Sequence, residues 1–453
     1  MAYVLKSANK NELEGFDEKE AINRIKALLS QWLRMENQAV LLGSGCSLQH
    51  EGLLFWDLES QTLEFLKDKY QNPDYKDDAA FKIINNRMSQ RCADNFVGTN
   101  FEEWLSYLTN AHFLLQDKNS GLKKIELEVI GEVHAKTLET LLLDIEKLIF
   151  SLCTLELPMP QMNGVTTHHA FVAKLLARDP SLGRAHIFTT NYDTLIEQAL
   201  DHLNILYADG FTGKSVSRFD TSSYGLDVYY PGEVSEGRVR RYDKYLHLYK
   251  LHGSISWKID PEIKDIISKH PNLKQARSWK TETELKGKIK KIDNAYEETN
   301  GTLGILPTAN KFSQTLSTPF AHLFRSLNIE LKKQQTFLLI MGYGFADEHI
   351  NKIIDDAMTN PSLVLLVVSP TKSDTIYKYF QKYAQLGERA FYLYSEGGDI
   401  GEIDKSEAPA TFYDFTHNLM PNIKWLDEFV KLRQHEKKIE STNSRPPKEE
   451  GIV

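Results

Sequence analysis

The chain has 453 residues, a formal net charge of -8 at pH 7 and 26% charged residues, which is ordinary for a folded, water-soluble protein. Its acidic balance argues against a general nucleic-acid-binding surface, so we expect no direct nucleic-acid binding beyond a local basic patch. No apolar run approaches the roughly 18 residues needed to cross a membrane, and the first residues are too polar for a secretion signal. The three cysteines, Cys46, Cys92 and Cys153, form no CxxC pair, which fits a cytoplasmic protein without membrane association.

The first helix is predicted over residues 18–35, where apolar residues recur at helical spacing. A buried strand follows at residues 39–42 and ends in Gly43-Ser44-Gly45-Cys46-Ser47. Glycines directly after a strand let the backbone approach a phosphate, and exposed amides can then bind it. The third glycine of a GxGxxG fingerprint would fall at Leu48, so a plain tight turn is the alternative interpretation.

Residues from about 60 to 165 are predicted to form a helical insertion between the first and second strands of the sheet, because their apolar residues also recur at helical spacing. This insertion is either an oligomer interface or a lid, and both interpretations stay open. Two adjacent histidines, His168 and His169, open the helix that follows it. Neighbouring positions on a helix point in different directions, so we expect no metal at this pair.

A second buried strand, residues 185–188, leads into Thr189-Thr190-Asn191-Tyr192-Asp193, and a helix is predicted from 194 to 200. Polar groups between a strand and a helix lie at the carboxyl edge of an open sheet, which is where α/β proteins bind nucleotides. The alternative interpretation is that Asp193 only caps the helix.

Two later strands end in stretches of the same kind. Residues 245–251 end in His252-Gly253-Ser254, and residues 336–341 end in Gly342-Tyr343-Gly344-Phe345. His252 is a candidate general base, because the pKa of histidine lies near neutrality and the following glycine leaves room for a substrate. A purely structural role is the alternative. The glycines of the second stretch suit close contact with a nucleotide, and one more strand is predicted at 363–368.

Two segments are predicted to lie outside the core. Residues from about 258 to 300 are dense in lysine and acidic residues, which favours a solvated insertion; a docking surface for DNA or a partner is the alternative. Residues 436–453 are charged and contain prolines, so we predict a disordered tail there. The remaining chain, residues 1–435, is predicted to form one domain.

In a doubly wound sheet, strand ends of these kinds converge on one crevice. The sequence therefore predicts an α/β fold, a Rossmann-like mostly parallel sheet with a helical insertion between its first and second strands.

Four stretches, IFTTNYD, LYKLHGS, PTANKFS and MGYGFADEHIN, occur in this order between residues 36 and 395. Together they resemble the sirtuin-like NAD-consuming domain, and the resemblance is closer to its bacterial anti-phage branch. Members of that branch pair with a HerA-type ATPase or carry a fused sensor. The resemblance implies that this chain uses NAD+ as a substrate.

The resemblance also implies roles for individual residues. Asn191 would orient the nicotinamide ribose or the attacking water, and His252 would be the general base. The residues that would bind NAD+ are Gly43, Ser44, Gly45, Ser47, Thr190, Asp193, Gly253, Ser254, Gly342, Tyr343, Gly344, Phe345 and Asp347. The loop at 43–47 would hold the pyrophosphate side, and the loop at 342–345, with Asp347, would hold the adenosine half.

The chain lacks the two CxxC pairs of the zinc ribbon that protein-deacetylating sirtuins carry, which favours metal-free NAD+ hydrolysis over peptide deacetylation. We therefore expect an oligomeric NAD+ hydrolase that releases nicotinamide and ADP-ribose and depletes NAD+ during phage infection. No fused sensor is recognised after the last strand, so control by a separate HerA-type ATPase is expected. One alternative is a zinc-free deacylase or ADP-ribosyltransferase. The other is an NAD- or ADP-ribose-binding sensor or scaffold without turnover, whose partner complex cuts DNA.

Overall fold

A nine-stranded sheet forms the centre of the computed structural model. The structure describes residues 2–8, 10–91, 100–127, 129–160, 165–213, 215–230, 241–259, 266–268, 289, 292–293, 296, 302–303, 319–385, 389–396 and 408–421. The strands of the sheet, in spatial order, are β2 (Lys10–Asn11), β1 (Ala2–Ser7), β16 (Ala390–Glu396), β15 (Leu363–Thr371), β14 (Thr336–Met341), β3 (Asn37–Leu42), β6 (Ala185–Thr189), β10 (Tyr245–Lys250) and β7 (Leu206–Ala208).

Every neighbouring pair from β16 to β7 is parallel, and at one edge β1 pairs antiparallel with both β16 and β2. The predicted Rossmann-like, mostly parallel sheet is therefore confirmed. The edge strands β1 and β2 and the strand β16 are additions that the sequence patterns did not reveal.

The order of the strands creates a switch point beside β3. The chain places β6 and β10 on one side of β3 and then returns to place β14, β15 and β16 on the other. Register aligns Met341, Leu42, Thr189 and Lys250 side by side across four strands. The segments that leave these strands therefore start at one level, at the edge where open α/β sheets bind ligands.

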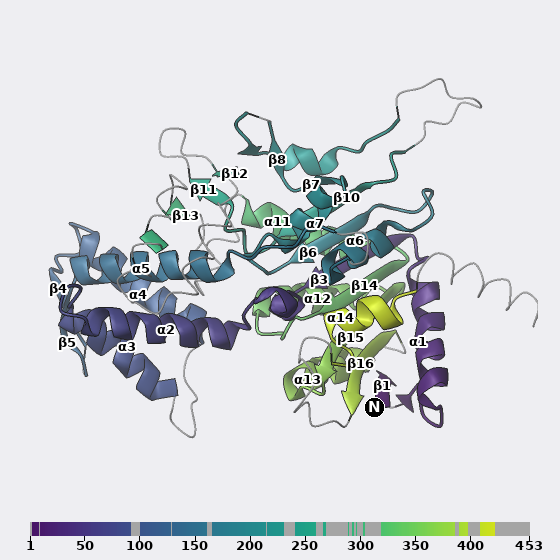
Figure 1. The fold of residues 1–453 in the computed structure, drawn as a ribbon, viewed down its shortest axis with the longest axis horizontal. Helices are drawn as coiled ribbons and strands as arrows, with labels where there is room; N and C mark the ends of the chain where they lie inside the picture. Colours follow the sequence, from purple (N-terminus) through teal and green to yellow (C-terminus); the bar gives the residue numbers. More distant parts are fainter. Residues whose placement is uncertain are drawn as a thin grey trace, which may run out of the picture.

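Helices cover both faces of the sheet (Figure 1). One apolar core holds residues of α1 (Glu18–Trp32), α6 (Thr167–Leu176) and α7 (Leu195–His202) against one face. A second core holds α11 (Phe320–Lys332), α12 (Glu348–Ala357) and α13 (Asp374–Ala384) against the other. Alternate residues of β3 enter the two cores, Val40 and Leu42 the first and Ala39 and Leu41 the second. This two-sided burial explains why the parallel strands are continuous apolar runs.

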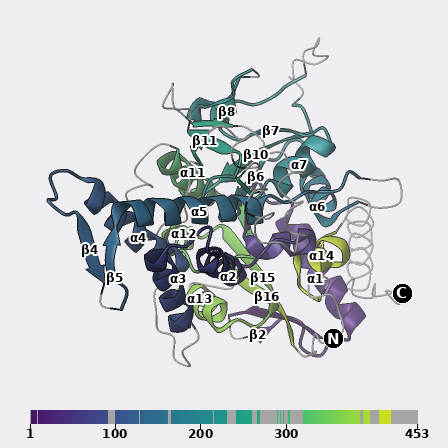
Figure 2. The ribbon, with the colours of Figure 1, turned by 60° about the vertical axis from the view of Figure 1, so that its left-hand side comes forward.

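The helical insertion lies between β3 and β6, the first two parallel strands along the chain, as predicted. It contains α2 (Phe55–Gln71), α3 (Asp78–Arg91), α4 (Phe101–Gln116) and α5 (Ala135–Cys153), with a hairpin of β4 (Lys124–Leu127) and β5 (Gly131–His134). Its helices share a separate apolar core and extend to one side of the sheet, with the hairpin at the far end (Figures 1 and 2). None of the described helices is long and apolar enough to span a membrane.

A small second sheet follows β7 along the chain. Its strands are β13 (Thr302–Leu303), β11 (Trp257–Ile259), β12 (Ile266–Ser268), β9 (Arg218–Phe219) and β8 (Phe211–Thr212), and η2 (Thr221–Gly225) comes next to β9 in sequence. Most of the predicted insertion at 258–300, and the whole predicted tail at 436–453, lie outside the described residues.

The segment 408–421 ties the N-terminal edge strand to the core. It forms α14 (Phe412–Asp414) and the π-helical turn η4 (Phe415–Leu419). The hydroxyl of Tyr3 donates to the Asp414 carboxylate at 2.9 Å. The ammonium of Lys174 donates to the carbonyls of Thr416 and Met420 at 2.6 and 2.9 Å. Because these carbonyls end a helical turn, the cation satisfies groups that would otherwise lack donors.

His168 is buried between this segment and the short helix η1 (Ser44–His50), with ring contacts to Phe412 and His50. Burial, aided by the neighbouring His50 and His169, lowers the pKa of His168 to about 3. The folded protein therefore keeps this imidazole neutral at pH values where an unfolded chain would protonate it.

We predict that His168 makes the fold sensitive to acid. Between about pH 6.5 and 3 the unfolded chain binds a proton at this position that the folded chain does not. The free energy of unfolding is therefore unaffected by His168 above about pH 6.5 and falls by about 1.4 kcal/mol per pH unit below it. His168→Gln should flatten the pH dependence of the free energy of unfolding by that slope, measured by urea denaturation between about pH 5 and 6.5. An unchanged slope in His168→Gln would contradict the prediction.

Candidate functional site

A cavity of about 480 Å³ lies at the carboxyl ends of the central strands, within the range of about 300–1,000 Å³ that is usual for small-molecule sites. Segments 43–49, 190–193, 341–344 and 346–347, together with His252, form its floor. Residues 368–370 near the end of β15 and residues 410–412 of the C-terminal segment also line it. The insertion supplies the opposite wall through Gly52, Leu53, Leu54, Phe55, Leu58, Asn100, Glu102, Leu152 and Cys153.

The glycine loops after β3 and β14 interlock beneath this cavity. The amide of Gly43 donates to the Met341 carbonyl at 2.9 Å, and the amide of Gly45 donates to the Gly342 carbonyl at 3.1 Å. A Cβ at Gly43 would lie 2.3 Å from the Gly342 oxygen, and Gly342 itself has a φ of +64°. Close backbone packing therefore requires these glycines, and two of the amides expected to face a phosphate are already used.

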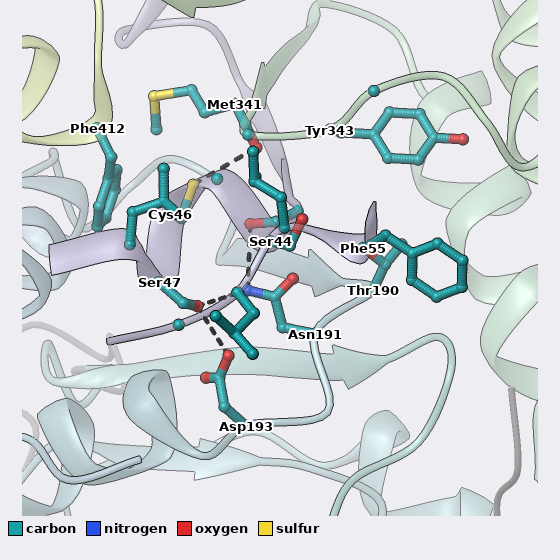
Figure 3. A pocket seen from close by; sticks show the side chains of 18 of the residues that line it. Ser44, Cys46, Ser47, Phe55, Thr190, Asn191, Asp193, Met341, Tyr343 and Phe412 are labelled. Carbon is teal, nitrogen blue, oxygen red and sulfur yellow. Dashed lines mark hydrogen bonds between the residues drawn. The ribbon is translucent and has the colours of Figure 1, made fainter. Parts of the chain in front are cut away.

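A hydrogen-bonded web fixes Asn191 at the end of β6 (Figure 3). Its amide nitrogen donates to the Gly43 carbonyl at 3.1 Å and to the Ser47 hydroxyl at 2.9 Å. The Ser47 hydroxyl in turn donates to the Asp193 carboxylate at 2.7 Å. Both hydrogens of the Asn191 amide are thus engaged, which determines the orientation of the group.

The side-chain oxygen of Asn191 has no hydrogen-bond partner within the described part of the chain, although it is buried. Leaving a buried acceptor unpaired costs about 1–3 kcal/mol. Asn191 lines the cavity, and its nitrogen is turned toward Ser47 (Figure 3). The arrangement therefore presents an oriented acceptor for a hydroxyl group or a water molecule.

A buried ion pair between Lys250 and Glu197 supports the segment 190–193. The side chain of Lys250, at the end of β10, is 2% exposed and lies 3.1 Å from the Glu197 carboxylate. Its ammonium also donates to the backbone carbonyl of Asp193. The carboxylate of Asp193 accepts from Ser47 through one oxygen and from the amide of Leu195, at 3.1 Å, through the other. Asp193 therefore supports Ser47 and also binds the amide near the start of α7. The N-cap of α7 is Thr194, so Asp193 lies one residue before the cap, and it also lines the cavity.

His252 and Asp347 meet across the cavity floor from two different strand ends. The imidazole Nε2 lies 2.8 Å from a carboxylate oxygen of Asp347, and the two side chains are 9% and 8% exposed. The other carboxylate oxygen accepts from the amides of His349 and Ile350 at the start of α12. The adenosine-binding role expected of Asp347 stays a prediction, while its carboxylate lies against His252.

Tyr192 links the site to the insertion. Its hydroxyl is buried and has no hydrogen-bond partner among the residues that the structure describes. Burial, with the nearby Glu102 and Cys153, raises the pKa of Tyr192 well above its ordinary value. The phenol therefore stays neutral and can donate a hydrogen bond to a ligand in the cavity.

Most of the residues expected to act in the site come together here. Those that line the cavity are Gly43, Ser44, Gly45, Ser47, Thr190, Asn191, Asp193, His252, Gly342, Tyr343, Gly344 and Asp347. Gly253, Ser254 and Phe345 are not among the lining residues. The Ser254 hydroxyl lies 3.4 Å from the Tyr192 carbonyl, and Phe345 stacks on Tyr379. Binding of NAD+ by these three stays a prediction.

Several lining residues were missed from the sequence. Tyr192 was part of a noted motif but received no role, and the wall from 52–58, 100–102 and 152–155 received none either. One signal was present: Asn100 and Glu103 form a capping box that begins α4, and its spacing could have located the helix start at Asn100. Nothing in the sequence pattern pointed to residues 410–412.

In the part of the chain that is described, no group of three or more His, Cys, Asp or Glu residues is arranged to hold a metal ion. The absence of a metal at the paired histidines stays a prediction. His169 bonds Thr166 at 2.9 Å and His202 at 3.0 Å.

Comparison with known proteins agrees with this architecture. Residues 185–384 match the family model described as SIR2-like domain, a span that begins at β6 and ends with α13. It contains Asn191, His252 and the glycine loop after β14, whereas the glycine loop after β3 precedes it. A search of curated proteins found no match to the chain. Residues 185–384 are therefore similar to a SIR2-like domain, and the parallel sheet with a cavity at its switch point agrees with this similarity.

We predict that the two glycine loops tolerate a methyl group very differently. Gly43→Ala should destabilise the protein by about 2 kcal/mol or more, because its Cβ would collide with backbone rather than with a flexible side chain. Gly344→Ala provides the matched control, since no atom lies within 4 Å of its added Cβ. This second variant should stay within about 0.5 kcal/mol of the wild type in chemical denaturation. Equal stability of the two variants would contradict the interlocked arrangement.

Proposed function

We propose that the chain is an NAD+ hydrolase that releases nicotinamide and forms ADP-ribose. The observation that carries the proposal is the buried side-chain oxygen of Asn191, which has no hydrogen-bond partner among the described residues and is held in one orientation at the cavity that His252 also lines. A binding protein needs no general base, whereas hydrolysis needs an oriented water and a proton acceptor.

The side chains suit cleavage of the bond between nicotinamide and ribose. As the C1′–N bond breaks, its electron pair leaves with nicotinamide and positive charge develops on the ribose. The Asn191 oxygen accepts a hydrogen bond from the attacking water or from a ribose hydroxyl, which holds the reactants together. A bond then forms between the water oxygen and C1′, and His252 takes the proton that the water loses.

The order of the strands supports one direction for the dinucleotide. Asn191 follows β6, the glycine loop at 43–45 follows β3, Gly342 follows β14, and Val368 to Pro370 lie at the end of β15. Because these strands are neighbours in that order, we place the nicotinamide ribose at Asn191, the pyrophosphate near the interlocked loops and the adenosine toward residues 368–370.

The insertion supports a site that excludes water. The residues it places on the cavity wall are mainly apolar, among them Leu53, Leu54, Phe55, Leu58 and Leu152. An apolar wall strengthens the interactions of Asn191 and His252 with a ligand. We therefore favour the lid interpretation of the insertion.

We further propose that the protein acts in the cytoplasm as an oligomer that depletes NAD+ during phage infection, under control of a HerA-type ATPase. The four motifs that resemble the anti-phage branch support this part of the proposal. Affinity purification of the tagged protein from its native host, before and after phage challenge, tests it. Recovery of no ATPase in either state would contradict the proposed partner.

Turnover of NAD+ tests the hydrolase proposal. Purified wild-type protein, alone or with the candidate ATPase, should release nicotinamide and ADP-ribose in equal amounts. Asn191→Ala and His252→Ala should each lower the rate by about 100-fold or more, while His134→Ala on the exposed hairpin should match the wild type.

The other outcomes identify the alternatives. Binding of NAD+ without release of nicotinamide would indicate a sensor or scaffold. Release of nicotinamide only in the presence of a second substrate would indicate a transferase or a deacylase. ADP-ribose attached to that substrate would identify the transferase, and an acyl group moved from it to ADP-ribose would identify the deacylase.

A further inference from the structure

The contact between His252 and Asp347 bears on how the imidazole of His252 is oriented to act as a general base. The two residues are 95 positions apart in the sequence, and their side chains approach to 2.8 Å with little exposure to solvent. In such an environment a hydrogen bond to a carboxylate is stronger than it would be on the surface.

The geometry fixes the carboxylate before any ligand binds. One oxygen of Asp347 accepts from the amides of His349 at 2.9 Å and Ile350 at 3.3 Å, as the N-cap of α12. The positive end of that helix also favours a negative charge at this position. With one oxygen held by the helix, the other is directed at the imidazole.

The loop that carries Asp347 is held by a second set of contacts. The Tyr343 hydroxyl lies 3.1 Å from the Asp347 carbonyl and 3.0 Å from the Asn351 side-chain oxygen. The Asn351 amide donates to the Phe345 carbonyl at 2.9 Å and to the Tyr379 hydroxyl at 3.0 Å. These buried contacts give the motif residues Tyr343, Phe345 and Asn351 a supporting function.

We propose that Asp347 is a positioning residue that sets the tautomer of His252. An ionised carboxylate only accepts hydrogen bonds, so the neutral imidazole must carry its proton on Nε2. The proton removed from water is then taken up at Nδ1. The resulting imidazolium is stabilised by the adjacent negative charge, as in other histidine–carboxylate pairs. This proposal rests on the proposed hydrolase function for its kinetic consequence, but not for the tautomer itself.

Asp347→Asn tests the proposal with little change in shape. Asparagine is as good an N-cap as aspartate, so its oxygen can keep the bonds to the start of α12 while its amide group faces Nε2. The amide donates, which makes Nε2 the acceptor and moves the imidazole proton to Nδ1.

We expect Asp347→Asn to lower kcat for NAD+ hydrolysis by about 100- to 10,000-fold, with the KM and the melting temperature close to those of the wild type. In the His252→Ala background, Asp347→Asn should cause no further loss. Asp374→Asn on the exposed first turn of α13 is the matched control and should leave all these values unchanged.

A direct measurement of the tautomer separates this inference from the proposed function. Nitrogen-15 NMR of histidine-labelled protein should show the His252 proton on Nε2 in the wild type and on Nδ1 in Asp347→Asn. If the wild type proves inactive toward NAD+, the hydrolase proposal fails while the NMR result still decides the tautomer. A His252 proton on Nδ1 in the wild type, or wild-type kcat in Asp347→Asn, would overturn the inference.

Discussion

The site depends on a backbone contact between two loops from neighbouring parallel strands. In the loop after β3, the amides of Gly43 and Gly45 donate to the carbonyls of Met341 and Gly342. The two backbones approach so closely that Gly43, Gly45 and Gly342 have no room for a Cβ. The carbonyl of Gly43 in turn accepts from the side-chain amide of Asn191. One close approach therefore fixes both the floor of the cavity and the orientation of its central side chain. Changes in this packing should be transmitted directly to Asn191, because it is bonded to the loop itself.

Two levels of support converge on the cavity. Beneath Asn191, Ser47 and Asp193 form a buried chain whose far end is anchored by Lys250 and the start of α7. Beside His252, Asp347 is anchored by the start of α12. Helix ends thus hold both carboxylates, and the parallel sheet brings the two helices to the same edge. Such preorganised groups act without a reorganisation cost when charge develops on a substrate.

The sequence was sufficient to predict the central architecture because burial on both faces leaves continuous apolar runs, as at residues 39–42, 185–188 and 336–341. Their polar and glycine-rich ends then located the shared edge. The edge strand β1 escaped notice because its apolar run is short, Tyr3 to Leu5, and because it pairs with the distant β16. Contacts between remote segments were equally hidden: no local pattern near Asp347 could show that its partner is His252, since α12 capping alone explains an aspartate there. The wall formed by the insertion likewise depends on how its helices pack, which periodicity does not determine.

The structure of the His252→Ala variant with bound NAD+ would test the central claim most directly. We expect the nicotinamide ribose against the side-chain oxygen of Asn191, the pyrophosphate over the interlocked loops and the adenosine toward residues 368–370. The reacting carbon and the water held by Asn191 should be about 3–3.5 Å apart. A dinucleotide bound in the reverse direction, or bound outside this cavity, would contradict it.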